Sequence, residues 1–160
     1  MDSRIAHFTT DVRYAETDAS GYVNIINYFT WLDSARDKFF IQLDTPYKEF
    51  EDNGIMLMLA GYSLEFKNPV RYGDLVQVLS AITEISAKRL TITHFVYKQD
   101  TKGEDPLCVC VAEARMAFVD SSTYKSTDFE KSKPDFYKRL RAFLMEGDWL
   151  EDSLLMSWGD

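Results

Sequence analysis

The clearest hydrophobic pattern in the chain follows Asn24. Apolar side chains recur there at spacings of three and four residues, while charged side chains fall largely on the other faces. This pattern predicts one amphipathic helix of about 27 Å, capped by the Asn24 side chain and ended before Pro46. A short second helix is expected between Pro46 and Gly54. The apolar face, which we expect to be core, consists of Tyr28, Trp31, Leu32, Ala35, Phe39 and Leu43.

Most of the remaining chain has the composition of β-strands. The candidate segments are rich in Val, Ile, Leu, Thr and aromatic residues. The connections between the later segments are short and contain turn-forming residues. They permit antiparallel neighbours and leave no room for crossover helices. The expected strands are residues 7–14, 55–66, 74–85, 89–100 and 107–120.

These elements predict an α+β fold in which an antiparallel sheet of about five strands wraps around the long helix. Strand 55–66 is apolar on both faces and is therefore expected at the centre of the sheet. A C-terminal helix is expected over residues 133–146. We assign residues 1–146 to one domain and residues 147–160 to an acidic C-terminal tail, and leave open whether this tail packs against the domain.

Composition excludes several classes of protein. A chain of 160 residues accommodates one domain, and its apolar fraction of 46% supplies a core without metals or disulfides. The net charge of −8 argues against nucleic-acid binding, which needs a basic face. Neither a secretory signal nor a run of about 18 apolar residues is found, so we expect no membrane segment and a cytoplasmic location.

The two cysteines, Cys108 and Cys110, lie two residues apart in an apolar run. Strand alternation predicts that both point to the same face, with no disulfide between them. No second cysteine pair or spaced histidine pair completes a zinc site. We expect two small buried hydrophobic residues in a reducing compartment and no bound metal.

Candidate chemistry centres on Asp18, a few residues before the long helix. The chain lacks the G-x-S-x-G, H-E-x-x-H, P-loop and G-x-G-x-x-G motifs, and His7 and His94 lie within strand patterns. The first turn of a helix has unpaired N–H groups and partial positive charge, which suit a developing oxyanion. A carboxylate beside such donors can attack a thioester or activate water. An aspartate in such a loop is, however, more often an ordinary turn residue.

The segment T-D-x-x-G-x-V-N-x-x-x-Y followed by W-L-D-S-A-R, residues 17–36, resembles the helix entry of hotdog-fold thioesterases of the 4-hydroxybenzoyl-CoA thioesterase type. Residues 66–74, F-x-x-P-V-R-Y-G-D, are similar to the family's link into its third strand. Residues 113–120, E-A-R-M-A-F-V-D, are similar to its final strand. The resemblance covers residues 9–120 and implies a five-stranded antiparallel sheet wrapped around one long central helix.

Carried over by position, the resemblance makes Asp18 the catalytic carboxylate and the Ile25 backbone amide the oxyanion donor. Whether Asp18 attacks directly or through water stays open. Some relatives carry a histidine where Tyr22 and Ile25 stand here, so side-chain assistance from that position is absent. The reaction implied needs no metal or redox cofactor, because coenzyme A enters as part of the substrate.

Four further residues are candidates for substrate binding. Gly21 permits a positive φ or a close approach of the backbone, and Asn24 caps the helix. Lys88 and Arg89 precede the fourth strand, near where the family type places basic residues against coenzyme A phosphates. Their alternative role is a solvated pair in a hairpin.

The function predicted is hydrolysis of an acyl-CoA thioester to a carboxylic acid and coenzyme A, with the acyl group unresolved. Three alternatives stay open: an acyl carrier protein thioesterase, a hotdog hydratase or dehydratase, and a non-catalytic acyl-CoA-binding module. We expect a homodimer or homotetramer, because one small sheet leaves strand edges exposed.

Overall fold

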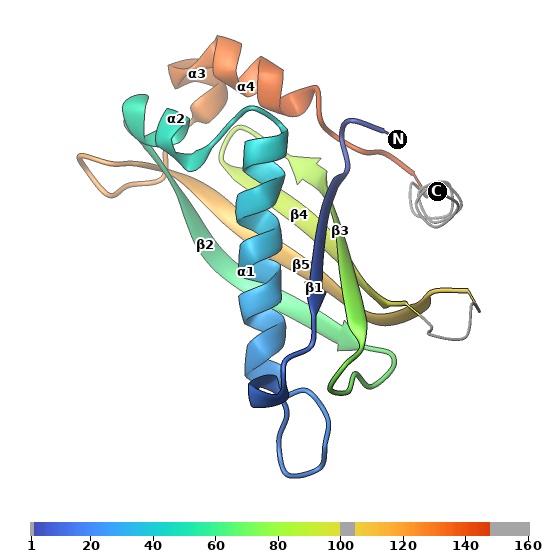
Figure 1. The fold of residues 1–160 in the computed structure, drawn as a ribbon. Coiled ribbons are helices and arrows are strands. Elements are labelled where there is room, and N and C mark those ends of the chain that lie inside the picture. The colour runs from blue at the N-terminus through green and yellow to red at the C-terminus, as the bar shows by residue number, and fades with distance from the viewer. Residues whose placement is uncertain (1, 100–104, 148–160) are drawn as a thin grey trace.

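The computed structural model describes residues 2–99 and 105–147. One antiparallel sheet with the strand order β1-β3-β4-β5-β2 curves around a single long helix, α1 (Figure 1). The predicted α+β class is confirmed. The elements of this unit are β1 Ala6–Asp11, α1 Ile25–Gln42, β2 Ile55–Phe66, β3 Leu75–Ile85, β4 Arg89–Lys98 and β5 Leu107–Asp120.

Helix α1 begins and ends close to the predicted residues. The Asn24 side chain accepts a hydrogen bond from the Ile26 N–H at 3.1 Å, and the helix ends at Gln42. The predicted apolar face is buried against the sheet. A short helix, α2 (Tyr47–Asp52), follows; shortly after its end comes Gly54, whose φ of +71° is readily adopted by glycine.

Strand β2 lies at an edge of the sheet, and the prediction that it is central was wrong. The centre is β4. Met58 and Leu59 on β2 are each 45% exposed, and a register shift between Leu59 and Gly61 bends the strand. Periodicity reports which side chains are apolar, but it cannot report whether both backbone edges of a strand are paired.

Two other predicted boundaries differ from the structure. The expected strand 7–14 stops at Asp11, because residues Tyr14–Glu16 form a 3₁₀ turn, η1. The expected helix 133–146 is shorter, α4 (Pro134–Arg141), and a separate short helix that was not predicted, α3 (Phe129–Ser132), precedes it. Proline disfavours helical backbone at the residue before it, and Lys133 has a φ of −139°. The predicted tail lies, beyond Gly147, outside the described residues.

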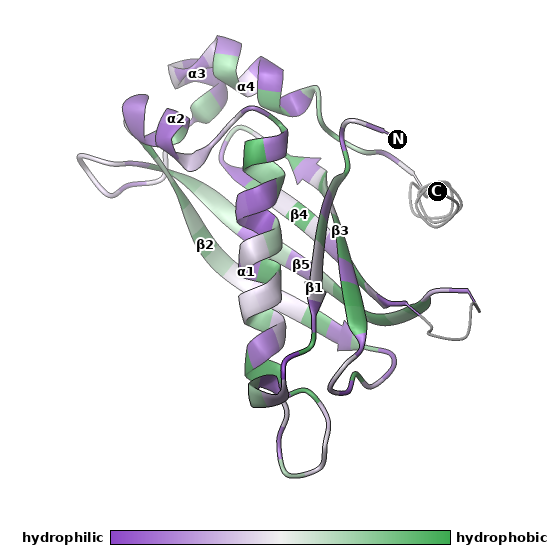
Figure 2. Cartoon of the chain, in the orientation of Figure 1, coloured by the Kyte–Doolittle hydropathy of each residue, from purple (hydrophilic) through white to green (hydrophobic). Residues whose placement is uncertain are grey.

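The core has an inner part under α1 and a smaller part on the outer face of the sheet. Aromatic side chains from α1, α2, α3 and α4 close one end of the inner part. Figure 2 shows hydrophilic residues on the outside of the short helices α2, α3 and α4. Cys110 belongs to the inner core, but Cys108 packs on the outer one. The prediction that both point to one face was wrong, because a register shift opposite Val96 and Tyr97 interrupts the alternation. Both thiols are free.

Candidate functional site

The loop between β1 and α1 carries most of the predicted site residues. It folds back on itself, with the Asp18 N–H donating to the Tyr22 carbonyl at 2.9 Å and the Gly21 N–H donating to the Asp18 carbonyl at 3.0 Å. Gly21 has a φ of +81°, the first of the two reasons for a glycine that were considered for this position. A backbone bridge between Tyr22 and Arg71 fastens the loop to the segment before β3.

Asp18 lies exposed on this loop. Its carboxylate accepts hydrogen bonds from the Ser20 N–H at 2.8 Å and from the Ser20 hydroxyl. The bonds from the Ser20 hydroxyl and amide hold the pKa of Asp18 below its usual value of 3.8. Asp18 is therefore ionised at neutral pH, as a nucleophile or general base must be.

The first amide of α1 is free. Asn24 takes the Ile26 N–H, whereas the Ile25 N–H has no acceptor among residues 2–99 and 105–147. The partial positive charge of the helix N-terminus adds to the electrophilic character of this amide. The role of oxyanion donor that the resemblance assigns to Ile25 requires such an unpaired amide, and it stays a prediction.

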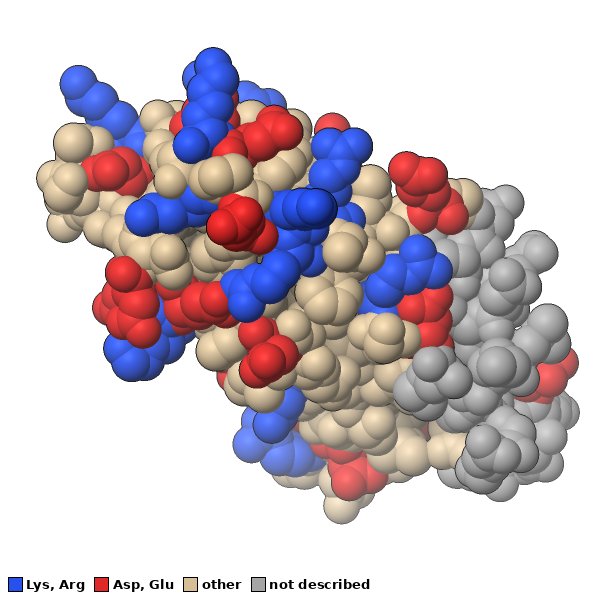
Figure 3. Space-filling model, turned by 90° about the horizontal axis from the view of Figure 1, so that it is seen from above, with Lys and Arg blue, Asp and Glu red and all other residues tan. Residues whose placement is uncertain are grey.

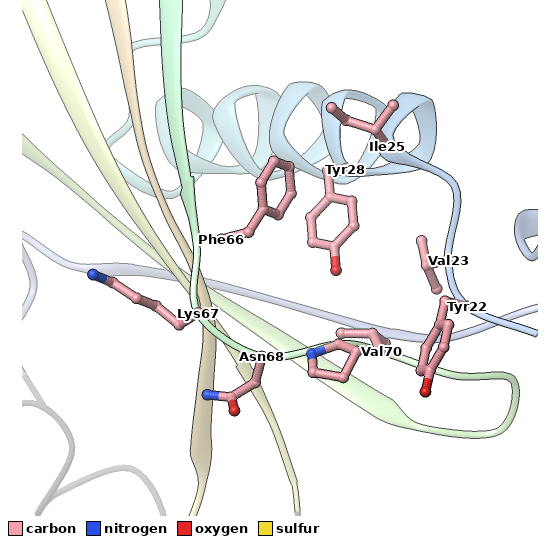
Figure 4. A pocket seen from close by; sticks show the side chains of 9 residues that line it. Tyr22, Val23, Ile25, Tyr28, Phe66, Lys67, Asn68 and Val70 are labelled. Atoms are coloured by element: carbon pink, nitrogen blue, oxygen red, sulfur yellow. The ribbon is translucent and has the colours of Figure 1, made fainter. Parts of the chain in front are cut away.

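A pocket of about 400 Å³ opens beside this amide (Figure 4). The hydroxyl of Tyr28, one helical turn after Ile25, points into it. The Tyr28 ring packs edge-on against Phe66 at 5.0 Å, and burial raises the pKa of its hydroxyl to about 12. Tyr28 is thus both core, as predicted, and a neutral donor in the pocket, which periodicity does not reveal. The pocket is lined by Tyr22, Val23, Ile25, Tyr28, Phe66, Lys67, Asn68, Pro69 and Val70.

The two basic residues that were predicted to bind phosphate lie away from this pocket. The Lys88 carbonyl accepts the Phe118 N–H at 3.1 Å, so Lys88 and Arg89 lie at the end of the sheet that is remote from the N-terminus of α1. The surface above this end, over α2, α3 and α4, carries basic and acidic side chains side by side (Figure 3). Nearer the pocket are Lys67, which lines it, and Arg71, whose guanidinium stacks 4.7 Å from the Tyr22 ring centroid.

Glu16 is a buried carboxylate that sequence reasoning missed. It is 3% exposed and accepts hydrogen bonds from Arg13 and from the Trp31 indole of α1. The sequence contains one indication of its role, the spacing Arg13-x-x-Glu16, which allows these two residues to cap one turn by hydrogen-bonding each other.

The histidines lie outside the pocket. His94 is fully buried in β4, where its Nδ1 lies 2.7 Å from the Ser80 hydroxyl and its Nε2 has no partner. Among the described residues, no group of three or more His, Cys, Asp and Glu side chains is placed to hold a metal ion. None of the helices in this part of the chain has the length and apolarity needed to cross a membrane.

Known proteins resemble this chain in sequence and structure. Over 127 residues it is 27% identical to the putative acyl-CoA thioesterase YneP of Bacillus subtilis, covering 79% of this chain and 88% of that protein. Over 89 residues it is 34% identical to a putative esterase of Aquifex aeolicus, covering 56% and 70%. The 4-hydroxybenzoyl-CoA thioesterase of a Pseudomonas species superposes with a TM-score of 0.73 at 22% identity, covering 86% of this chain and 99% of that one.

The match to a family model is longer than half of the chain. Residues 12–142 match the Thioesterase-like superfamily, a range that contains the helix entry, the pocket and all the described strands except β1. The structural neighbours share the hotdog arrangement of a sheet wrapped around one helix. The chain therefore belongs to the Thioesterase-like superfamily and is a hotdog-fold enzyme of the class that hydrolyses thioesters.

Proposed function

We propose that this protein hydrolyses acyl-CoA thioesters in the cytoplasm, with Asp18 as nucleophile or general base and the Ile25 amide as oxyanion donor. One observation supports the proposal: the loop that carries the ionised Asp18 leads directly into the Ile25 amide, which is unpaired among the described residues. Ile25 lines the pocket together with Tyr22 and Val23 of this loop, whereas Asp18 itself lies outside the lining. The relatives point the same way, since one is described as a putative acyl-CoA thioesterase.

In this reaction negative charge develops on the thioester carbonyl oxygen, and the Ile25 N–H donates a hydrogen bond to it. Asp18 either attacks the carbonyl carbon, forming an anhydride that water then opens, or removes a proton from the attacking water. The bond to sulfur breaks in both routes. The products are the carboxylic acid and the free thiol of coenzyme A, and no metal or redox cofactor takes part.

We also propose that the protein is at least a homodimer, paired through the free edge of β2. A long edge strand with exposed apolar residues such as Met58 and Leu59 is a template for another strand. A two-fold axis would set the two β2 strands antiparallel. The remote end of one sheet, with Lys88 and Arg89, would then lie level with the helix N-terminus of the other protomer. At about 4.8 Å per strand, two strands separate that end of β4 from the interface, a distance a coenzyme A molecule can span.

The test of the function is release of free thiol from short, long and aryl acyl-CoAs, followed by comparison with the matching acyl carrier protein thioesters. We expect turnover with coenzyme A esters and a preference for one acyl class. Release only from the carrier protein would transfer the proposal to that substrate. Binding without release from any of them would support the non-catalytic module.

Replacing Lys88 and Arg89 together with alanine should raise KM for acyl-CoAs more than it lowers kcat, because remote contacts contribute mainly to binding. With truncated substrates that lack the nucleotide, the double variant should behave like the parent protein. Steady-state kinetics on both substrates make the comparison. Equal losses on both would show that the pair is structural.

The pH profile should report the low pKa of Asp18. The active form is the carboxylate, so kcat/KM should stay level as pH falls from neutrality and decline only below 3.8. Ser20→Ala removes the hydroxyl that contributes most to lowering this pKa, and should move the decline to higher pH. A decline near neutrality in the parent protein would assign the base to another group.

A further inference from the structure

We propose that Glu16 is a positioning residue for thioester hydrolysis: its buried carboxylate holds the loop that carries Asp18 in place against the first turn of α1. The inference rests on the proposed roles of Asp18 and Ile25. Glu16 is only 3% exposed and its carboxylate is already hydrogen-bonded to Arg13 and Trp31, so it acts through these groups and not on the substrate.

The side chain of Glu16 joins the loop to the helix. One carboxylate oxygen accepts the Arg13 N–H at 2.8 Å. The other accepts the Arg13 guanidinium and the Trp31 indole N–H, both at 3.1 Å. Trp31 lies in the second turn of α1 and is itself 2% exposed. A single carboxylate therefore connects the chain entering the loop with the body of the helix.

The backbone of Glu16 makes a second connection. Its carbonyl accepts the N–H of Asn24 at 2.9 Å and the side-chain amide of Asn27 at 2.8 Å. Asn24 is the cap residue directly before Ile25, and Asp18 follows Glu16 by two residues. The two groups that must meet at the thioester carbonyl are thus both attached, over one or two residues, to contacts made by Glu16.

The charge of Glu16 is part of this arrangement. Burial alone would raise its pKa, but the hydrogen bonds from Arg13 and Trp31 outweigh burial and lower the pKa below 4.5. The three groups that contact this side chain are all hydrogen-bond donors, and the ionised carboxylate is their acceptor. Glutamine would retain the shape but turn one amide N–H₂ toward one of these donors.

We therefore expect Glu16→Gln to lower kcat by about 10- to 100-fold while KM changes less than about threefold, because a misplacement of about 1 Å between reacting groups costs up to 10² in rate. The variant keeps the pocket lining, so substrate binding should survive. A second variant, Trp31→Phe, removes only the indole donor and should lower kcat in the same direction. The double variant should lose less than the product of the two single losses, since both break one link.

Ser80→Ala is a matched structural control. It removes one partner from the buried Ser80–His94 contact, which lies in the sheet outside the pocket lining. We expect it to lower Tm as Glu16→Gln does, yet to leave kcat at the parental value. A loss of stability alone therefore cannot imitate the predicted loss of turnover.

NMR of the Trp31 indole N–H gives a readout that is independent of activity. Trp31→Phe assigns its resonance, and in the parent protein this resonance should shift as pH falls through the lowered pKa of Glu16. In Glu16→Gln the shift should be absent. A folded Glu16→Gln protein with parental kcat, or a Trp31 resonance that ignores this titration, would overturn the positioning role while thioester hydrolysis stands. Absence of thiol release from the parent protein would instead remove the proposed function itself.

Discussion

Asp18→Asn should fold normally and hydrolyse its best acyl-CoA about 10² to 10⁴ times more slowly than the parent protein, the usual loss for a missing general base. A missing nucleophile would cost more. Asparagine retains the size of the side chain and an oxygen that can accept the Ser20 hydrogen bonds, so the loop should keep its form. The measurement is turnover beside a melting curve for each protein.

The chain offers a matched control for this substitution. Asp120 forms the same kind of turn at the end of β5, where its carboxylate accepts the Ser122 N–H at 3.0 Å and the Ser122 hydroxyl at 2.6 Å. Asp120→Asn should lower Tm slightly, as the substitution of a turn residue ordinarily does, and should leave kcat unchanged. If Asp18→Asn behaves like this control and retains nearly parental turnover, Asp18 is only a turn residue and the mechanism fails.

Met58→Lys combined with Leu59→Lys should give a monomer whose KM for acyl-CoAs is raised at least as far as in the variant that lacks the Lys88 and Arg89 side chains. Adjacent lysines on a free strand edge oppose pairing by charge repulsion and desolvation. KM rises because the proposed phosphate contacts, Lys88 and Arg89, lie too far from the pocket of their own chain to reach the same coenzyme A. Size-exclusion chromatography with light scattering gives the mass, and thiol release gives the activity.

Thr9→Lys is the control for this prediction. It adds one positive charge to β1, the other edge strand of the sheet, at an exposed residue. We expect it to leave both mass and turnover unchanged. A strictly monomeric double variant with parental kcat/KM would show that one chain contains the complete site, and a double variant that stays dimeric would place the interface elsewhere.

Local physics explains why so much of the fold could be predicted. Helix α1 follows from the spacing of its apolar residues and from Asn24 at its cap, both of which depend only on neighbours along the chain. Strands β2 and β5 have the predicted bounds because their β-rich runs end at turn-forming residues. Asp18, Gly21 and Ile25 lie around the N-terminus of α1 because they are close to it in the sequence.

Contacts between distant segments decided the rest. The edge position of β2 depends on which strands pair, and the separation of Cys108 from Cys110 depends on a bulge that only the β4–β5 register creates. The remote location of Lys88 and Arg89 follows from the length of β3 and β4 across the sheet.

By itself, then, the sequence determined the elements, the fold class and the loop that carries Asp18, because capping, periodicity and turn chemistry act within a few residues. Only the tertiary structure showed that Tyr28 opens into a pocket with Phe66 and that Glu16 binds the Trp31 indole fifteen residues away. These features depend on free volume and on buried hydrogen-bond partners, which exist only once the sheet has closed around the helix.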